Sequence, residues 1–358
     1  MNSADGRVAK GFLGFGRGKM VDYSRKKPHL LNLLRYSPLN VLKAAETKLL
    51  RKRASTYCYN YPAVIQVEVT TRCNLTCYMC PRMEELKKKG TKARDMSFET
   101  FKTIVDQAQG LYSINPFGRG EPLIVPDIFR MIEYSVEKRV PHVSITTNGL
   151  LLKGETARAL SRTGLTELRI SIDGADEETY WKIRRADLAE LKACIKEFRR
   201  ISDIPISINF VLGEENWDGL RQMPSLTAEV GAQCLRVFHM LGEHASKGKR
   251  LALDDGQGER YGSLSKELRG KCKDLGVAFI MDRLEFRSCL WPFIMAFIDI
   301  DGYLTPCCKL EEIQLDSVLE KGLFPAWNGL PMRRWRSHLL LGRIPKRCLD
   351  IHCIAGSP

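Results

Sequence analysis

Residues 63–81 of this 358-residue chain read AVIQVEVTTRCNLTCYMCP, and this stretch decides the fold. The β-branched run from Ala63 to Thr70 predicts a strand. The strand leads directly into Cys73, Cys77 and Cys80, which have Cys-x3-Cys-x2-Cys spacing. Three thiolates gathered in one loop can bind three irons of a 4Fe-4S cube and leave one iron open. A structural zinc site needs four closed ligands, so the spacing favours an iron–sulfur cluster.

Short β-branched runs and helical patterns alternate along the next 170 or so residues. The predicted strands are 63–70, 112–117, 142–147, 167–173, 205–212 and 234–239, and the predicted helices are 98–109, 128–138, 155–163, 177–201 and 217–230. Repeated βα units imply a parallel sheet with right-handed crossovers. Six units are too few for a closed eight-stranded barrel. We therefore expect an α/β fold, a partial (β/α)6 TIM-like barrel whose chemistry lies at the carboxyl ends of the strands.

Changes in composition predict four segments. They are a basic amphipathic arm (1–60), the barrel core (61–245), a helical connector (246–274) and a small cysteine-rich domain of hairpin and helix (275–358). The arm is the main source of the net charge of +14, because residues 1–55 contain 13 Lys and Arg against 3 Asp and Glu. Leucines recur between these basic residues, and this pattern predicts one or two amphipathic helices. The arm packs on the main domain in one interpretation, and contacts an anionic membrane surface or an acidic partner in another.

The composition also bears on location and partners. The chain has 12 cysteines and no recognisable export signal, which indicates metal ligation in a reducing compartment, the cytoplasm, rather than disulfides. No stretch is long and apolar enough to predict a membrane helix. Nucleic acid is not an expected partner, because no DNA-reading motif accompanies the basic charge.

The cysteine spacing at the end of the first strand resembles the radical S-adenosylmethionine (radical SAM) superfamily. The resemblance covers about residues 63–353 and implies an enzyme in which Cys73, Cys77 and Cys80 hold the catalytic cluster, whose open iron binds S-adenosylmethionine. It further implies a flavodoxin- or ferredoxin-type reductant. The electron it supplies cleaves the cofactor to methionine and a 5′-deoxyadenosyl radical, which removes a hydrogen from the substrate. Met79 replaces an aromatic residue of many members, and we expect it to pack on the adenine.

Further matches to the superfamily stand at the ends of later strands. Gly118-Arg119-Gly120-Glu121 is similar to its glycine-glycine-glutamate motif, which implies that this turn receives the cofactor's ammonium group, although Arg119 replaces or flanks one expected glycine. The segment from Ser171 to Asp173 looks like its ribose-binding segment, and Arg184 like the arginine that reaches the methionine carboxylate. The residues expected at the cofactor are Met79, Gly120, Glu121, Thr147, Asn148, Ser171, Asp173 and Arg184. A plain Asn-Gly turn explains Asn148 equally well.

The cysteines near the end of the chain resemble the auxiliary-cluster domain called SPASM, or its shorter relative called twitch. Cys289, Gly302 and Cys307 fit its Cys-x(9 to 15)-Gly-x4-Cys hairpin. The implied ligands of one auxiliary 4Fe-4S cluster are Cys289, Cys307, Cys348 and Cys353. Cys308 stays open as a spare thiol, an alternative ligand, or part of a second site with Cys272.

The reaction class implied is radical-based substrate modification, with two substrate classes open. The main prediction is oxidation of a small polar or sugar-like metabolite, in which the auxiliary cluster accepts the second electron. The alternative is a maturase that modifies a ribosomally made peptide, and a more remote one is a non-catalytic iron–sulfur electron carrier. Candidate catalytic residues at strand ends are Arg119, Asn209, Arg236 and His239, although structural hydrogen bonds are the commoner role of such residues.

Overall fold

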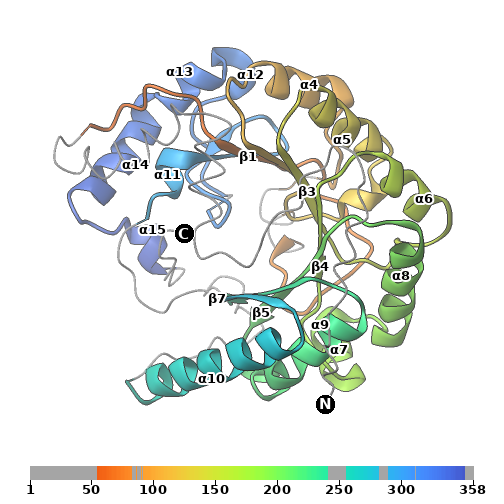
Figure 1. Cartoon of the computed structure of the whole chain (residues 1–358). Coiled ribbons are helices and arrows are strands. Elements are labelled where there is room, and N and C mark those ends of the chain that lie inside the picture. The colour runs from red at the N-terminus through yellow and green to blue at the C-terminus, as the bar shows by residue number, and fades with distance from the viewer. Residues whose placement is uncertain are drawn as a thin grey trace, which may run out of the picture.

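A single nine-stranded sheet organises the molecule. The computed structural model describes residues 55–82, 86, 90, 92–240, 255–281, 289–310 and 312–350. The strand order is β7-β6-β5-β4-β3-β2-β1-β8-β9. The strands are β1 (Val64–Val67), β2 (Ser113–Pro116), β3 (His142–Thr147), β4 (Glu167–Ser171), β5 (Ile206–Leu212), β6 (Cys234–His239), β7 (Ala278–Met281), β8 (Met295–Ile298) and β9 (Leu304–Thr305). Figure 1 shows the sheet curving round an open interior, with helices on its outer side.

The six predicted strands are all present and pair in chain order. Each of β1 to β6 is parallel to the next, which confirms the expected α/β partial barrel. Two further parallel pairings were not predicted: the additional strand β7 extends the sheet beyond β6, and β8, a strand of the predicted hairpin, pairs with β1 at the other side. The paired order has two ends, at β7 and β9, so the sheet remains open.

Helices follow the strands as expected, with one break. They are α4 (Phe98–Asp106), α5 (Ile128–Glu137), α6 (Gly154–Arg162), α7 (Glu177–Arg184), α8 (Leu188–Ile201) and α9 (Met223–Glu229). The single helix predicted over 177–201 is two helices, because Arg185 takes a left-handed φ of 56° and ends α7. Asp187 then caps α8 by accepting a hydrogen bond from the backbone of Glu190. This break places Arg184 at the very end of a helix.

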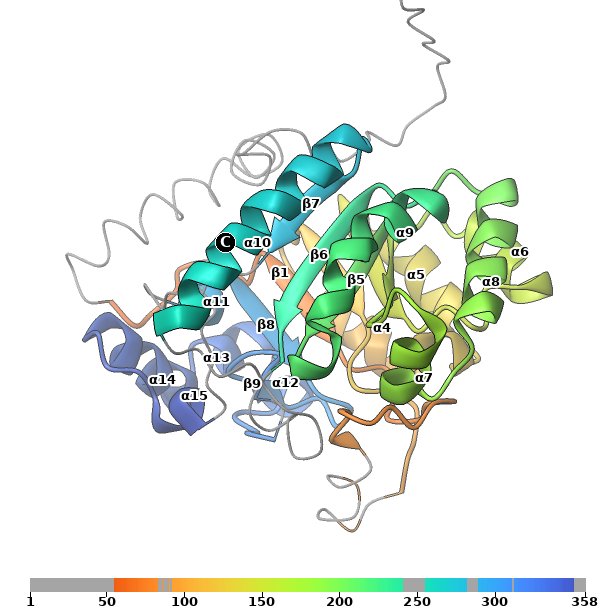
Figure 2. The ribbon, with the colours of Figure 1, turned by 90° about the horizontal axis from the view of Figure 1, so that it is seen from below.

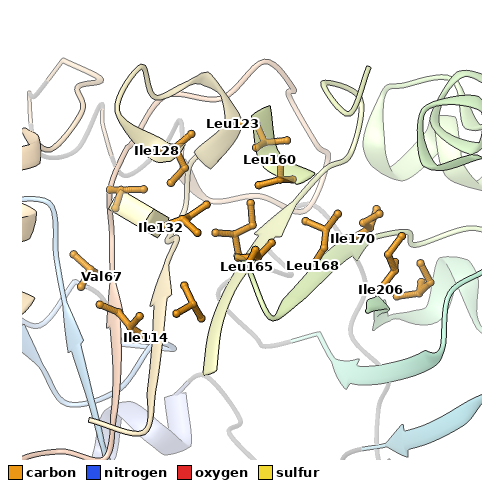
Figure 3. Close-up of a cluster of buried hydrophobic side chains, with 14 of the residues drawn as sticks. Val67, Ile114, Leu123, Ile128, Ile132, Leu160, Leu165, Leu168, Ile170 and Ile206 are labelled. Atoms are coloured by element: carbon orange, nitrogen blue, oxygen red, sulfur yellow. The ribbon is translucent and has the colours of Figure 1, made fainter. Parts of the chain in front are cut away.

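The apolar core lies between the strands and these helices. Alternate strand residues point outward and are fully buried against helix side chains, as Figure 3 shows for Val67, Ile114, Leu168 and Ile170. Each such side chain contributes about 1.5–3 kcal/mol when fully buried. The apolar residues of the β-branched runs therefore form the outer face of the sheet, which the helices cover.

The inward residues of the same strands are polar. Glu167 is buried on β4 and pairs with Arg236 of β6 at 2.8 Å and with Arg169 at 2.8 Å. His142 on β3 and Ser207 on β5 also contact its carboxylate. Burial alone would raise the pKa of Glu167, but the two guanidinium groups hold that pKa well below its usual range. A charged, hydrogen-bonded network thus fills part of the interior.

The C-terminal part continues the barrel sheet. The predicted hairpin is confirmed, because β8 pairs with β9 antiparallel and Gly302 in the turn has a φ of 79°. The other elements here are α11 (Trp291–Ile294), α12 (Val318–Lys321), α13 (Leu323–Trp327), α14 (Leu330–Leu340) and α15 (Lys346–Asp350). Figure 2 shows β8 and β9 beside the helices α12 and α13. Since β8 also pairs with β1, this region is joined to the barrel edge by hydrogen bonds.

The segments predicted from composition agree with the structure only in part. The connector predicted over 246–274 corresponds to α10 (Asp255–Asp274), while β7, in the segment predicted as the small domain, pairs with the barrel strand β6. The amphipathic helices predicted for the arm fall on residues 1–54, which are outside the described residues. In the part of the chain that is described, no helix combines the length and apolarity needed to span a membrane.

Candidate iron–sulfur and cofactor site

The cysteine loop, residues 71–82, leaves β1 at its carboxyl end and gathers three thiols. Burial raises the pKa of both Cys73 and Cys80, and the neighbouring thiols add to each shift because like charges repel. The backbone N–H of Leu75 donates to Cys73 Sγ at 3.4 Å. Backbone N–H groups thus reach the sulfurs of Cys73 and Cys80, and each of these hydrogen bonds favours the thiolate and opposes the shift caused by burial.

Three thiols in one loop are the kind of donor set that an iron–sulfur cluster uses. Among the described residues, no three His, Cys, Asp or Glu side chains are arranged to hold one metal ion. Each thiolate of an iron–sulfur cluster binds its own iron, so the sulfurs need not converge on one point. That Cys73, Cys77 and Cys80 bind three irons of one cluster and leave the fourth iron open stays a prediction.

Three residues that the sequence analysis did not select support the loop. Arg82 is buried and donates to the backbone carbonyls of Thr71 at 3.1 Å and Leu75 at 3.4 Å. Asn74 Oδ1 accepts a hydrogen bond from Asn148 Nδ2 at 2.7 Å, which joins the loop to the end of β3. Tyr180 is fully buried near Arg184, and its hydroxyl has no hydrogen-bond partner within the described structure. Of these three residues, only Arg82 had a signal in the sequence that could have indicated its role: it is a cation placed two residues after the last cysteine, Cys80.

Gly120 and Glu121 pack directly on the cysteine loop. A Cβ on Gly120 would stand 2.5 Å from the carbonyl oxygen of Thr70, so only glycine fits. The carboxylate of Glu121 accepts hydrogen bonds from Thr147 Oγ1 at 2.6 Å, Asn148 N at 2.7 Å and Leu123 N at 3.0 Å. Burial raises the pKa of Glu121, and these donors oppose the shift. Both carboxylate oxygens of Glu121 thus help to join the segment after β2 to the end of β3. That Gly120 and Glu121 contact the cofactor's ammonium group stays a prediction.

Asp173 and Arg184 form a buried ion pair beside the cysteines. Asp173 is fully buried, pairs with the Arg184 guanidinium and accepts from Val211 N at 2.6 Å. Arg184 Nη1 also points at Cys77 Sγ, 3.8 Å away. Burial would lower the pKa of Arg184, but the Asp173 carboxylate and the Cys77 thiol raise it. The guanidinium predicted to reach the cofactor's carboxylate therefore lies against a cluster cysteine.

Met79 and Ser171 occupy the walls of the same region. Met79 is buried with Ile183 of α7 and Met240. Ser171 stands half-buried at the end of β4, opposite Asn209 in the register of β4 and β5. The adenine contact of Met79 and the ribose contact of Ser171 stay predictions.

The four candidate catalytic residues have different surroundings. Arg119 pairs with the buried Glu68 at 3.0 Å, and Arg236 with Glu167. His239 shares the outward face of β6 and contacts Tyr261 Oη of α10 at 2.8 Å, and burial lowers its pKa to about 4. Asn209 differs, because its Oδ1 is buried and has no hydrogen-bond partner in the described ranges. Of the four, Asn209 offers an acceptor for a ligand most directly.

Two of the predicted auxiliary cysteines lie beside one small apolar cluster. Cys307 and Cys348 both pack beside the buried Leu310, with Trp335 of α14. Cys289 immediately precedes α11, and Cys353 lies outside the described residues. The N–H of Lys309 donates to Cys307 Sγ at 3.4 Å.

Cys272 and Cys308 are in contrasting environments. Cys272 is fully buried in α10, and burial, with the adjacent Cys234 thiol, raises its pKa to about 12. Its thiol thus belongs to the helix–sheet core. Cys308 is half-buried next to Cys307, so a second site shared by Cys308 and Cys272 has no support from this placement.

Comparisons with known proteins agree with this geometry. The profile of the radical SAM superfamily matches residues 67–224, and that of the SPASM iron–sulfur cluster-binding domain matches residues 289–353. An AdoMet-dependent heme synthase from Methanosarcina barkeri is 30% identical over 184 residues, covering 51% of this chain and 52% of that relative. The PqqA peptide cyclase of Gluconobacter oxydans is 30% identical over 182 residues, covering 50% of this chain and 49% of the relative. The chain thus matches about half the length of these two relatives.

A solved structure shares the fold over a longer stretch. The crystal structure of Streptococcus suis SuiB bound to precursor peptide SuiA superposes with a TM-score of 0.65 at 18% identity. The match covers 83% of this chain and 71% of that chain. This likeness confirms the partial barrel with its C-terminal extension.

Proposed function

Because the chain belongs to the radical SAM superfamily and carries a C-terminal SPASM domain, we propose that it is a radical enzyme that modifies a peptide. The two domains imply a catalytic 4Fe-4S cluster, S-adenosylmethionine and auxiliary iron–sulfur clusters. When reduced, the catalytic cluster supplies the electron that cleaves the cofactor and generates the radical that takes a hydrogen from the substrate. A flavodoxin- or ferredoxin-type protein is the proposed reductant.

The proposal of a peptide substrate rests on the similarity of the chain to a peptide cyclase. The PqqA peptide cyclase aligns with this chain at 30% identity over 182 residues. Oxidation of a sugar-like metabolite, the main prediction from sequence, has less support, since neither relative described above is named for a sugar.

The residues of this chain have distinct proposed tasks. Arg184 holds the cofactor's carboxylate, because its guanidinium already lies 3.8 Å from Cys77 Sγ and is fixed by Asp173. Asn209 positions the substrate through its unpartnered Oδ1. Cys289 and Cys307 hold auxiliary iron beside the barrel edge, where the second electron can leave the substrate.

Isotope transfer tests the substrate class. Anaerobically reconstituted protein is incubated with dithionite, S-adenosylmethionine and perdeuterated synthetic peptides encoded by short reading frames beside its gene. We expect deuterium in the released 5′-deoxyadenosine and a changed mass of one peptide, with neither in the Cys73→Ala variant. Transfer from a labelled sugar, with none from any peptide, would restore the small-metabolite function.

A further inference from the structure

Three buried side-chain donors without acceptors lie where residues 55–61 contact the C-terminal helices α13 and α14. They are Asn60 Nδ2, Trp327 Nε1 and Arg336 Nη2, here called the donor cluster, and none has a hydrogen-bond partner among the described residues. Figure 1 shows the first described residues passing beside α13 and α14, which carry Trp327 and Arg336. Unpartnered buried polar groups are rare, and each one needs an explanation.

Arg336 is the centre of this group. Its side chain is fully buried, and its guanidinium stacks on the ring of Trp327 at 4.2 Å. Nε donates to the carbonyl of Pro292 at 2.7 Å, and Nη1 donates to the carbonyl of Thr56 at 3.1 Å. These acceptors are neutral, and no carboxylate pairs with Arg336 in the part of the chain described here. No described residue therefore supplies a counter-charge to this buried cation, and a buried charge without one is unfavourable.

Asn60 belongs to the same layer. Two residues before it, the N–H of Cys58 donates to Asn328 Oδ1 at 2.8 Å, next to Trp327. One residue after it, the ring of Tyr61 lies 4.9 Å from that of Phe324 in α13. Contacts on both sides thus hold Asn60 against α13.

A second cation increases the positive charge. Arg333 lies one turn before Arg336 on α14 and donates to Thr56 Oγ1 at 3.2 Å. Burial lowers the pKa of Arg336 to about 10, and repulsion from Arg333 adds to the shift while the Cys58 thiol opposes it. Thr56 thus accepts hydrogen bonds from both guanidinium groups, and Arg336 also stacks on Trp327.

The character of these groups favours an anion over water. A water molecule accepts hydrogen bonds but must also donate its own two protons. Asn209 Oδ1, a buried acceptor without a partner in the described structure, belongs to the barrel, whereas the three atoms of the donor cluster are all donors. We propose that the donor cluster binds one small oxyanion, a carboxylate or a phosphate-like ion, which joins residues 55–61 to α13 and α14 behind the auxiliary cysteines. An anion here satisfies the free donors and neutralises Arg336 together.

Thermal unfolding of the reconstituted full chain tests this site. The protein is desalted into a chloride buffer and titrated with sodium phosphate, sulfate or acetate at constant ionic strength. A ligand that binds only the folded state should raise Tm by about 2 °C for each tenfold increase above its Kd. Ion chromatography of the unfolded protein should recover about one anion per chain.

Asn60→Asp gives a test whose sign distinguishes the alternatives. If the donor cluster needs an acceptor, a carboxylate at position 60 supplies it, raises Tm without added anion and removes the response to anions. Asn216→Asp is the matched control, because buried Asn216 donates to the carbonyls of Asp173 and Val211 at 2.9 Å each. A carboxylate there must lower Tm, because it cannot donate to either carbonyl.

Two outcomes would overturn the proposal. A wild-type Tm that ignores all anions, with Asn60→Asp as damaging as Asn216→Asp, would show that the donor cluster needs no negative charge. A stabilising Asn60→Asp in a protein that neither responds to anions nor releases one would mean that the chain itself fills the site, which excludes a free ligand.

Discussion

The cysteine loop and the auxiliary cysteines differ in how the chain brings their sulfurs together. Cys73, Cys77 and Cys80 lie within eight residues of one another and share a loop fixed by contacts from β3 and α7. The predicted auxiliary ligands are spread from Cys289 to Cys353 in the sequence; of the described ones, Cys289 precedes α11, Cys307 follows β9 and Cys348 lies in α15. A site made by one loop is determined locally, whereas a site made by distant segments forms only as those segments fold and bind metal.

The largest expected difference concerns cofactor cleavage. Cys73→Ala should abolish release of 5′-deoxyadenosine, because it removes a ligand of the catalytic cluster. Combined Cys289→Ala and Cys307→Ala should retain that release, lose the modified product and lower iron from about eight to about four atoms per chain. Chromatography of the nucleoside and iron analysis measure both. Unchanged iron in the double variant would remove the auxiliary cluster from the account.

The second-largest expected difference is the loss of unfolding free energy when an ion pair is broken in each of the two regions. Arg184→Met leaves Asp173 charged and fully buried, which should cost about 3–5 kcal/mol of unfolding free energy. Arg347→Met in α15 breaks a pair with Glu312 whose side chains are 40% and 27% exposed, and should cost about 0–1 kcal/mol. Denaturant titration of both variants gives the comparison. Equal losses would show that the cysteine loop is no more tightly fixed than the auxiliary region.

Backbone packing should give a smaller effect. Gly120→Ala pushes a methyl group against the carbonyl of Thr70 and should cost about 1–3 kcal/mol while raising the KM for S-adenosylmethionine. Gly258→Ala is the control, because nothing lies within 4 Å of its Cβ position in α10. A normal KM in Gly120→Ala would separate this turn from cofactor binding.

The smallest expected effect is a change in how steeply the free energy of unfolding depends on pH. The folded-state pKa of Glu167 is depressed, so its contribution to stability is complete above its unfolded pKa of about 4.3 and is lost as the pH falls. Glu167→Gln should therefore flatten the acid limb of stability by at most about 1.4 kcal/mol per pH unit. Denaturant midpoints between pH 3 and 7 test this. An unchanged acid limb would assign the dependence to other carboxylates.

The sequence was most informative where a pattern is local. The strands β1 to β6 were predictable because their outward residues are β-branched and buried, and the three cysteines because their spacing is short. β7 was missed since Ala278–Met281 is a short, half-exposed edge strand, and the end of α7 since Arg185 adopts a left-handed φ without being glycine. Asn74 was missed because its partner, Asn148, lies 74 residues away, and Arg82 because its acceptors are backbone carbonyls, which every residue has.

The central claim, that Cys73, Cys77 and Cys80 hold a cluster open to S-adenosylmethionine, is tested most directly by cofactor cleavage. Anaerobic protein with reconstituted clusters is mixed with dithionite and S-adenosylmethionine, and 5′-deoxyadenosine is measured by liquid chromatography and mass spectrometry. The account predicts 5′-deoxyadenosine from the wild type and none from Cys73→Ala. A fully loaded wild-type protein that releases no 5′-deoxyadenosine would contradict it.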